Sequence, residues 1–454
     1  MPQTGGQLNR TVLAAYAAPA FSQALIHGPV GTVIQGIYGR DFGVALTSIA
    51  FALVVSRIFD AVTDPVIGYL SDRYRTRYGH RKPWLIVGSL IAVVACWYLY
   101  IPPDEVTAGY FLFWSLLAYF GWTVSEIPYR AWMADLTDDY QQRTRIAAWR
   151  TFARYLGFIA FYGIPLLPFF ETTEFTAETL KVTAVLAAVA LPTTALIAAW
   201  LVPQGDAVIS AGRPSLRQVL PALVKNRPLL IFLATFATGG LATGCAFGVL
   251  FFFVDNHLGL GATLALLFVL GAPIGAITMP FWVWLANRIG KERSWAVAYT
   301  CSATFLLLHL LIPAGPDGRI WLIAMFILVF SVSSAGVVVP AALLADIVDY
   351  GKWKFRGDYA GTYYSVQTMV EKGVEGLGVA LGLAVVSWFG FDPQLSTQTD
   401  RGTFGLLLGF PVLPAVLTLL TVPIIWRFPI NRRRQQIIVR RLERNRAEAY
   451  DRAS

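Results

Sequence analysis

The sequence predicts an all-α membrane protein with twelve transmembrane helices arranged in two pseudo-symmetric six-helix bundles. Hydrophobic residues make up 56% of the 454 residues and charged residues only 14%, whereas a soluble domain carries roughly 25% charged residues. Apolar stretches of about 20 residues, the length that crosses a bilayer as a helix, recur along the chain. Polar motifs near the ends of the second and fourth stretches recur six stretches later, which indicates two related halves.

Twelve spans follow from these apolar stretches and from the charged connections between them. In the first half we place them at about 11–39, 43–71, 83–102, 107–134, 147–170 and 180–202. In the second half we place them at about 228–254, 259–287, 294–314, 319–347, 361–390 and 403–427. The predicted domains are a first bundle at 1–202, a cytoplasmic linker at 203–227, a second bundle at 228–430 and a basic tail at 431–454.

The positions of the basic residues predict the orientation. Most of the 36 Lys and Arg residues lie in the connections after spans 2, 4, 8 and 10, in the linker and in the tail. Cytoplasmic loops of membrane proteins carry such an excess, so both termini are expected in the cytoplasm. The net charge of +9 is thereby explained without a nucleic-acid partner. The basic tail predicts a short helix at an anionic membrane surface.

The two halves show a weak internal repeat. The run 69–82 after span 2 resembles 284–291 after span 8. A proline followed by an Ala-Asp pair closes span 4 at Asp135 and span 10 at Asp346. Matching positions six spans apart are typical of duplicated transporters.

Two aspartates lie in the middle of the second span. Asp60 and Asp64 are four residues apart and therefore share one face of a helix. A charged side chain at this depth costs at least about 2.5 kcal/mol, and such residues are functional candidates. Thr63 lies beside them, and Pro65 cannot hydrogen-bond to the preceding turn. These oxygens suit Na⁺ or a transferable proton, and the alternative is an internal salt bridge with Arg57.

Further charges lie inside spans 4, 5 and 11. Glu126 and Arg130 are four residues apart and could neutralise each other. In span 11, Lys372 lies between two glutamates. It either forms a local ion pair with one of them or extends to the acids of the first half, and the sequence leaves both alternatives open. The other charges of these spans are Asp135, Arg150, Arg154, Glu371 and Glu375.

Aromatic residues near these charges suit a sugar ring, whose C–H faces are apolar. In span 1 the strongly polar mid-span residues are Gln23 and His27, and His27 is interpreted as a packing residue. The three cysteines have no metal-ligand spacing, so no cofactor is expected. No HExxH or GxSxG motif and no Cys/His cluster is present, so an enzyme is not expected.

Several motifs together resemble a known family, the glycoside–pentoside–hexuronide:cation symporters of the major facilitator superfamily. The resemblance covers essentially the whole chain. The matching segments are Arg57–Pro65, Asp72–Trp84, Glu126–Tyr129, Arg143–Arg145 with Trp149-Arg150, Asp346–Gly351 and Tyr364–Gly373.

The resemblance implies a twelve-helix, two-domain fold that works by alternating access in a bacterial inner membrane. It implies a cation site at Asp60 and Asp64, with Thr63 and Thr123 as further ligands. It places Glu126 at the junction of the sugar and cation sites. The other residues expected to contact substrate are Gln23, Arg130, Arg150, Gln367, Thr368 and Lys372.

Two departures from the family pattern point to the substrate. The family's sugar permeases have an acidic residue in span 1, where this chain reads Ala-Phe-Ser-Gln-Ala around Gln23. An aromatic residue under the sugar is replaced by Arg130. A more cationic pocket predicts an acidic sugar, such as a hexuronate, a glucuronide or a sulfonated sugar, because arginine binds carboxylates through two parallel hydrogen bonds.

The sequence thus predicts cation-coupled symport of a sugar, with Na⁺ and H⁺ both open. The alternative is an uncoupled facilitator or a carrier of lysolipids or other amphiphiles on the same fold. The expected partners are a small sugar and the lipid bilayer, with a monomer as the working unit. We expect the cytoplasmic loop Ser71–Lys82 to hold the outward-facing state through ion pairs with neighbouring spans. The expected gating residues are Asp72, Arg73, Asp135 and Asp349.

Overall fold

The computed structural model describes residues 8–74, 76–137, 140–204, 216–355, 357, 359–395 and 397–451. The described residues form helices joined by short connections, and the one β-bridge among them joins Thr76 to Gly79 in a turn. The expectation of an all-helical fold is confirmed. Much of the predicted linker, together with Arg213 and Pro214, lies outside the described residues.

Contacts divide the chain into two units. Unit 1 comprises Met1–Ile209, Leu250–Val269 and Ser387–Thr403, and unit 2 comprises Ser210–Val249, Leu270–Val386 and Phe404–Ser454. Two short segments of the sequence's second half therefore group with unit 1. The bundle boundaries given above stay a prediction.

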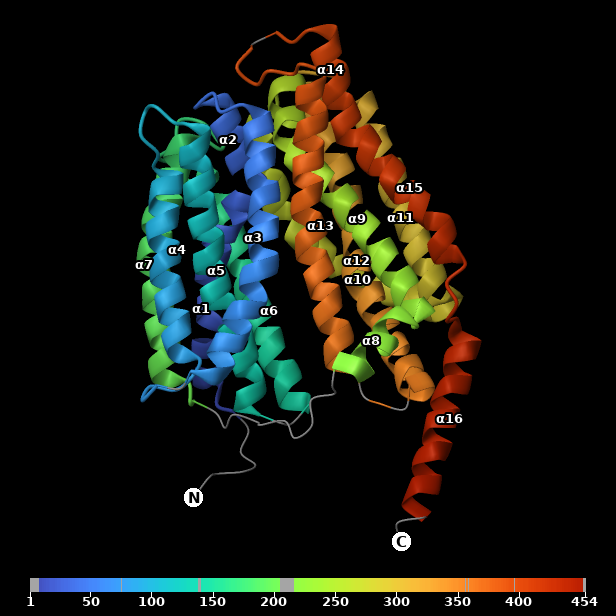
Figure 1. Ribbon diagram of the computed structural model, residues 1–454. Coiled ribbons are helices and arrows are strands. Elements are labelled where there is room, and N and C mark those ends of the chain that lie inside the picture. Colours follow the sequence, from blue (N-terminus) through green and yellow to red (C-terminus); the bar gives the residue numbers. More distant parts are fainter. Residues whose placement is uncertain are drawn as a thin grey trace. The chain divides into compact units, whose positions relative to one another are not determined.

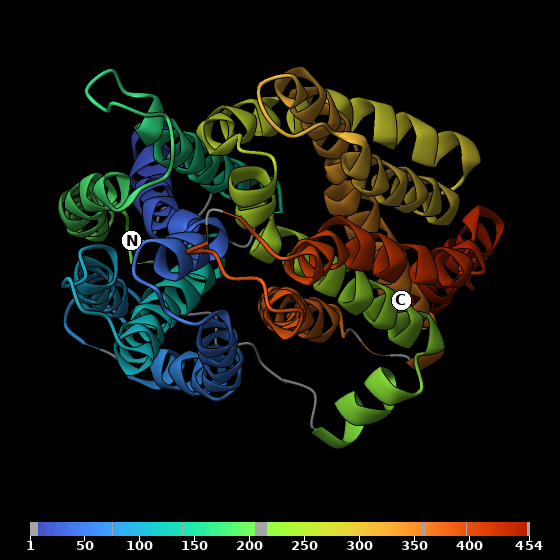
Figure 2. The same cartoon turned by 90° about the horizontal axis from the view of Figure 1, so that it is seen from above.

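The helices of the first half run side by side in Figure 1 and are seen end-on in Figure 2. Helix α1 packs against α6 and α7, α4 packs against α5 and α7, and α3 packs against α5. The elements are α1 (Arg10–Thr32), α2 (Ile34–Arg40), α3 (Leu46–Arg73), α4 (Lys82–Tyr100), α5 (Ala108–Leu136), α6 (Tyr140–Gly163), η1 (Ile164–Leu166) and α7 (Ala177–Leu201).

The second half continues from α8 to α16. Helix α11 packs against α12 and α15, and α16 packs against α12. The elements are α8 (Leu216–Val224), α9 (Arg227–Phe252), η2 (Phe253–His257), η3 (Gly261–Thr263), α10 (Leu264–Ile289), α11 (Lys291–Leu308), η4 (His309–Leu311), α12 (Gly318–Phe355), α13 (Ala360–Trp388), α14 (Asp400–Leu407), η5 (Leu408–Val412), α15 (Leu413–Trp426) and α16 (Arg432–Asp451).

Each predicted span falls on one helix or on consecutive helices. Among the described residues, seven helices are long and apolar enough to cross a membrane, and one bent pair, Gly261–Gly271 with Pro273–Ile289, could make eight. Helices α1, α5, α6 and α13 are not among them. They carry most of the mid-span polar residues singled out above, which lower their hydropathy. The count of twelve spans stays a prediction.

Local sequence explains where the helices begin and how closely they pack. The Thr107 hydroxyl accepts a hydrogen bond from the Tyr110 amide at the start of α5, an N-cap that satisfies a backbone donor. In unit 2, a Cβ on Gly244 would lie 2.1 Å from the Glu375 carbonyl oxygen, and one on Gly378 would lie 2.4 Å from that of Leu241. Glycine is therefore required where α9 and α13 touch.

Candidate functional site

The two central aspartates lie on α3, where they make different contacts. Asp60 is buried, and its Oδ2 lies 3.1 Å from an Nη of Arg57, one turn earlier on the helix. The Arg57 guanidinium also lies over the Tyr119 ring of α5, 4.2 Å from its centroid. The salt bridge left open as an alternative is therefore formed, and Arg57 is held from both sides.

Asp64 contacts the next helix. Its Oδ1 accepts a hydrogen bond of 2.9 Å from the hydroxyl of Thr123, a fully buried residue of α5. Thr63 instead donates to the carbonyl oxygen of Phe59 in its own helix, at 3.0 Å. The packing of α3 on α5 thus brings two of the four expected cation ligands together. Both threonine oxygens keep lone pairs that can bind a cation.

Glu126 is the centre of a charged cluster in α5 and α6. Its side chain is 2% exposed, and its Oε1 accepts from Nε of Arg130 at 2.5 Å and from Arg150 of α6. Its Oε2 is buried without a hydrogen-bond partner among the described residues. The i, i+4 pairing with Arg130 matches the sequence expectation, and Arg150 adds a second cation to one oxygen. One positive charge is in excess within this group of three.

Two tyrosines fix the backbone beside this cluster. The Tyr16 hydroxyl donates to the Tyr129 carbonyl oxygen at 2.9 Å, and the Tyr129 hydroxyl donates to that of Tyr16 at 2.5 Å. The Arg150 guanidinium lies 5.2 Å from the centre of the Tyr129 ring, in a cation–π contact. Helices α1, α5 and α6 are thereby tied together where the charges lie.

Gln23 of α1 also lies in this region. It is buried and donates to the hydroxyl of Ser125 at 3.2 Å, next to Glu126 in sequence. Ser125 was not expected from the sequence, because a lone serine in an apolar helix carries no distinguishing pattern. His27 packs its ring 4.9 Å from that of Trp122, in line with its interpretation as a packing residue.

Two of the four expected gating residues, Asp72 and Asp135, meet through Arg81, which the sequence did not single out. Arg81 Nε lies 3.0 Å from Asp135 Oδ2, and an Nη lies 2.7 Å from Asp72 Oδ1. A further Nη donates to the Ser71 hydroxyl at 3.0 Å, and His80 Nε2 lies 3.0 Å from the same Asp135 oxygen. Arg81 therefore joins the end of α3 to the end of α5.

The other two expected gating residues lie elsewhere. Arg73 bonds the hydroxyl of Tyr69 on its own helix. In unit 2, Asp349 accepts from Gln435 of α16 at 2.9 Å. The nearby Asp346, the repeat counterpart of Asp135, pairs with Lys291 at 2.7 Å. Each half thus has an arginine or lysine at the start of a helix bound to the aspartate of the repeat motif.

The remaining substrate candidates belong to α13 in unit 2. Gln367 and Thr368 are partly exposed, and the Thr368 hydroxyl donates to the Tyr364 carbonyl oxygen at 3.0 Å. The side chain of Lys372 lies outside the described residues. Within the described part of the chain, no group of three or more His, Cys, Asp and Glu residues is placed to hold a metal ion.

A third charged cluster lies in unit 1 around Arg40, at the end of α2. Its guanidinium lies 2.7 Å from Asp41 and 2.7 Å from Asp255, and 3.9 Å from Glu174. Partial burial is the main cause that raises the pKa of Glu174 above its usual value, and repulsion from the Asp255 carboxylate is the second cause. Asp255 was not expected here, because only folding brings residues 40 and 255 together.

Long apolar helices with buried acids and arginines are typical of multi-pass membrane transporters, and a solved transporter structure has the same fold. The crystal structure of the nucleoside transporter NupG superposes with a TM-score of 0.65 over 92% of this chain and 99% of that chain, at 15% identity. At this identity the likeness concerns the fold alone. Together with the transporter family whose model matches the chain, this fold is that of the major facilitator transporters, not of an enzyme.

The chain belongs to the family described as MFS/sugar transport protein, whose model matches residues 15–432. The resemblance to glycoside–pentoside–hexuronide:cation symporters is thereby confirmed. The glucuronide carrier protein homolog of Escherichia coli (strain K12) is 24% identical over 421 residues, which cover 87% of each chain. The sodium-dependent lysophosphatidylcholine symporter 1 of Gallus gallus is 23% identical over 434 residues, 85% of this chain and 80% of that protein.

Proposed function

We propose that this transporter couples entry of an acidic sugar or glycoside to a cation, by alternating access in a bacterial inner membrane with both termini in the cytoplasm. Sugar transport follows from the family. The observation that carries the acidic substrate is the pairing of two guanidinium groups with one carboxylate oxygen of Glu126. The excess positive charge of the group formed by Glu126, Arg130 and Arg150 favours an anion over a neutral sugar, because Arg binds carboxylates with charge-assisted hydrogen bonds.

The roles of the cluster residues follow from their exposure. The Arg130 side chain is 39% exposed and that of Arg150 is 18% exposed, whereas Glu126 is enclosed. Arg130 is therefore the guanidinium that meets the sugar acid. Glu126 orients both arginines through Oε1 and keeps Oε2 for a sugar hydroxyl. Gln367, Thr368 and Lys372 complete the substrate site from the second half in this proposal.

The cation is proposed to bind Asp60 and Asp64, with Thr123 and Thr63 as neutral oxygen ligands. The contact between Thr123 and Asp64 supports this, since it places oxygen ligands from two helices at one point. Hard cations such as Na⁺ prefer carboxylate and hydroxyl oxygens, and the same carboxylates can carry H⁺. The glucuronide carrier homolog and the sodium-dependent symporter support an acidic sugar and Na⁺ respectively.

The test is substrate-dependent cation entry in proteoliposomes, with matched neutral and acidic sugars, such as a glucoside and the corresponding glucuronide. We expect the glucuronide to drive Na⁺ or H⁺ entry, and Asp64→Asn to abolish it. Arg130→Gln is expected to lower glucuronide uptake about tenfold or more, for the loss of one charge-assisted contact. Glucoside uptake by the same variant is the internal control.

Three results contradict the proposal in different parts. Equal loss of both sugars in Arg130→Gln means that the arginine does not recognise the acid. Uptake without cation flux indicates an uncoupled facilitator. Competition by lysophosphatidylcholine, without any sugar transport, favours the amphiphile carrier, for which the lysophosphatidylcholine symporter is a precedent.

A further inference from the structure

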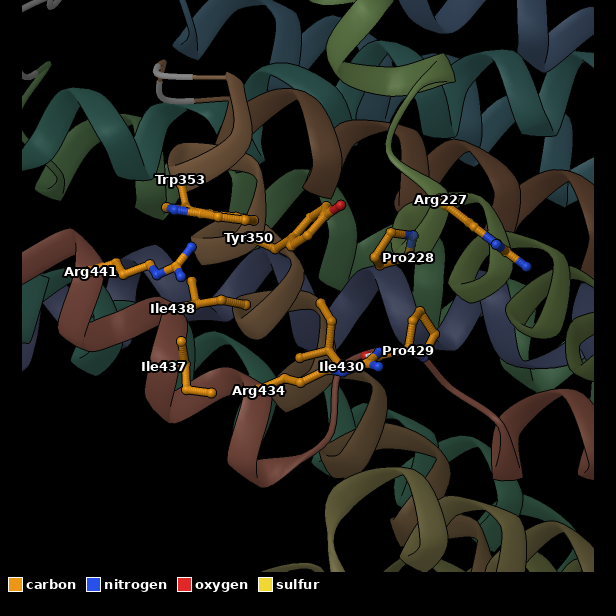
Figure 3. A pocket seen from close by; sticks show the side chains of 10 residues that line it. All are labelled: Arg227, Pro228, Tyr350, Trp353, Pro429, Ile430, Arg434, Ile437, Ile438 and Arg441. Carbon is orange, nitrogen blue, oxygen red and sulfur yellow. Dashed lines mark hydrogen bonds between the residues drawn. The ribbon is translucent and has the colours of Figure 1, made fainter.

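A pocket lies in unit 2, among α9, α12 and the tail helix α16. Its volume is about 280 Å³, and three arginines line it: Arg227 at the start of α9, and Arg434 and Arg441 on α16 (Figure 3). Tyr350 and Trp353 of α12 form another wall. None of the side chains lining it is acidic. Such a pocket favours an anionic group.

Two of these arginines are fixed in place. Arg434 donates from an Nη to the Pro429 carbonyl oxygen at 2.6 Å, which leaves its other N–H groups to bind a ligand. The Arg441 guanidinium lies 5.4 Å from the centre of the Trp353 ring, in a cation–π contact that orients it. Arg227 adds its charge at the N-terminal end of α9, where the helix dipole is also positive.

The remaining walls are apolar. Ile430 and Ile438 are buried, and Pro228 and Pro429 lie between the arginines in Figure 3. A small hydrated anion gains nothing from such walls, whereas the glycerol and first acyl carbons of a phospholipid do. The mixture of basic and apolar surface therefore favours a lipid over a free anion.

The pocket lies next to the end of a membrane-spanning helix. The apolar helix α15 ends at Trp426, and Pro429 follows three residues later. Trp426 is 54% exposed, and Arg293 lies over its ring, 5.9 Å from the centroid. Exposed tryptophans with flanking arginines are typical of the level at which lipid headgroups lie. The arginines of the pocket are thus placed at headgroup depth.

We propose that this pocket binds the phosphate headgroup of an anionic phospholipid, such as phosphatidylglycerol or cardiolipin. The headgroup phosphate contacts Arg434 and Arg441, with Arg227 adding its charge, and the bound lipid holds α16 against α12. Only the assignment to the cytoplasmic leaflet rests on the topology proposed above. Basic pockets between membrane helices on that side bind such headgroups in other proteins.

The test compares two double variants of the tail helix with equal loss of charge. Arg434→Gln with Arg441→Gln removes two pocket arginines, and Arg433→Gln with Arg440→Gln removes two that do not line the pocket. Full-length protein in neutral detergent is titrated with phosphatidylglycerol. Bound lipid is counted by native mass spectrometry, and stability is followed by thermal unfolding. We expect the pocket variant to bind at least about tenfold more weakly than the control variant.

Three results overturn the proposal. Equal weakening in both double variants means general attraction of a basic helix to acidic lipid. Equal binding of phosphatidylcholine means that the headgroup charge is not recognised. Stabilisation by inorganic phosphate alone means a soluble-anion site.

Because the double change removes the bond from Arg434 to Pro429, Arg441→Gln alone is measured as well, and several-fold weaker lipid binding is expected of it. Sugar uptake is scored separately, so failure here leaves the transport proposal untouched.

Discussion

Arg81 offers the sharpest test of how the first half is held together. Its side chain is 9% exposed, and that of Asp135 is 8% exposed. Replacing Arg81 with methionine keeps the apolar length and removes the guanidinium. Asp135 then keeps only His80 of its two basic neighbours. Removing one partner of a buried ion pair costs about 3–5 kcal/mol.

The contact with Asp72 adds little to this figure, since its side chain is 39% exposed and exposed pairs contribute at most about 1 kcal/mol. We therefore expect Arg81→Met to lower the free energy of unfolding by about 3 kcal/mol, roughly a hundredfold in the equilibrium constant. The matched control is Arg77→Met in the same loop, where the guanidinium lies over the Tyr78 ring at 4.7 Å. A loss of about 1 kcal/mol or less is expected there.

The assay is equilibrium unfolding in mixed detergent micelles, followed by circular dichroism and tryptophan fluorescence. Combining Arg81→Met with Asp135→Asn tests the pairing directly, because the double variant no longer buries an unpaired charge. We expect it to regain about 2 kcal/mol relative to the sum of the single changes. If Arg81→Met is no less stable than Arg77→Met, or if the double variant shows no coupling, the reasoning is refuted.

Four further outcomes are expected. Thr123→Val weakens cation binding several-fold, measured by cation activation of sugar uptake. Thr63→Val has a smaller effect, because the Thr63 hydroxyl is hydrogen-bonded within its own helix. Lys291→Met destabilises the protein less than Arg81→Met in the same unfolding assay, since its side chain is 34% exposed. Asp255→Asn lowers the melting temperature by breaking its short ion pair. Glu174→Gln does not lower the melting temperature at neutral pH. The raised pKa of Glu174 means that the folded state favours the protonated acid, so stability falls as pH rises through that pKa. Glutamine does not titrate, so the variant loses this pH dependence of stability.

The positions of the helices and of most buried charged residues could be predicted from the sequence, because both depend on local composition. Apolar length located the long helices, and i, i+4 spacing joined Glu126 to Arg130, as the structure has it. Spacing could not reveal that Arg150 binds the same oxygen. That contact depends on how α6 lies against α5, and no local pattern encodes it.

The same limit explains Arg81 and Lys291. Both lie within the repeated runs 69–82 and 284–291, but neither run shows which acid its basic residue binds. Gly79 and Gly290 precede them with positive φ of 103° and 102°, a conformation that favours glycine. The repeat of a glycine turn, a basic residue and a distant Ala-Asp pair could have indicated the ion pair in each half. A single such motif could not.

The two aspartates of α3 differ in a way that bears on coupling. Arg57 holds Asp60 with a full positive charge, whereas Thr123 offers Asp64 a neutral hydroxyl. A cation that binds both carboxylates must compete with Arg57 at Asp60 and meets no such competition from Thr123. Removing the Arg57 side chain should therefore strengthen cation binding. We expect Arg57→Gln to lower the cation concentration for half-maximal binding about tenfold or more, by the worth of one charge-assisted contact.

Because Arg57 also packs on Tyr119, the control for lost packing is Tyr119→Leu, which keeps the salt-bridge partners. Cation binding to Arg57→Gln that is unchanged or weaker, while Tyr119→Leu binds normally, would show that Arg57 helps to build the site instead of competing for it.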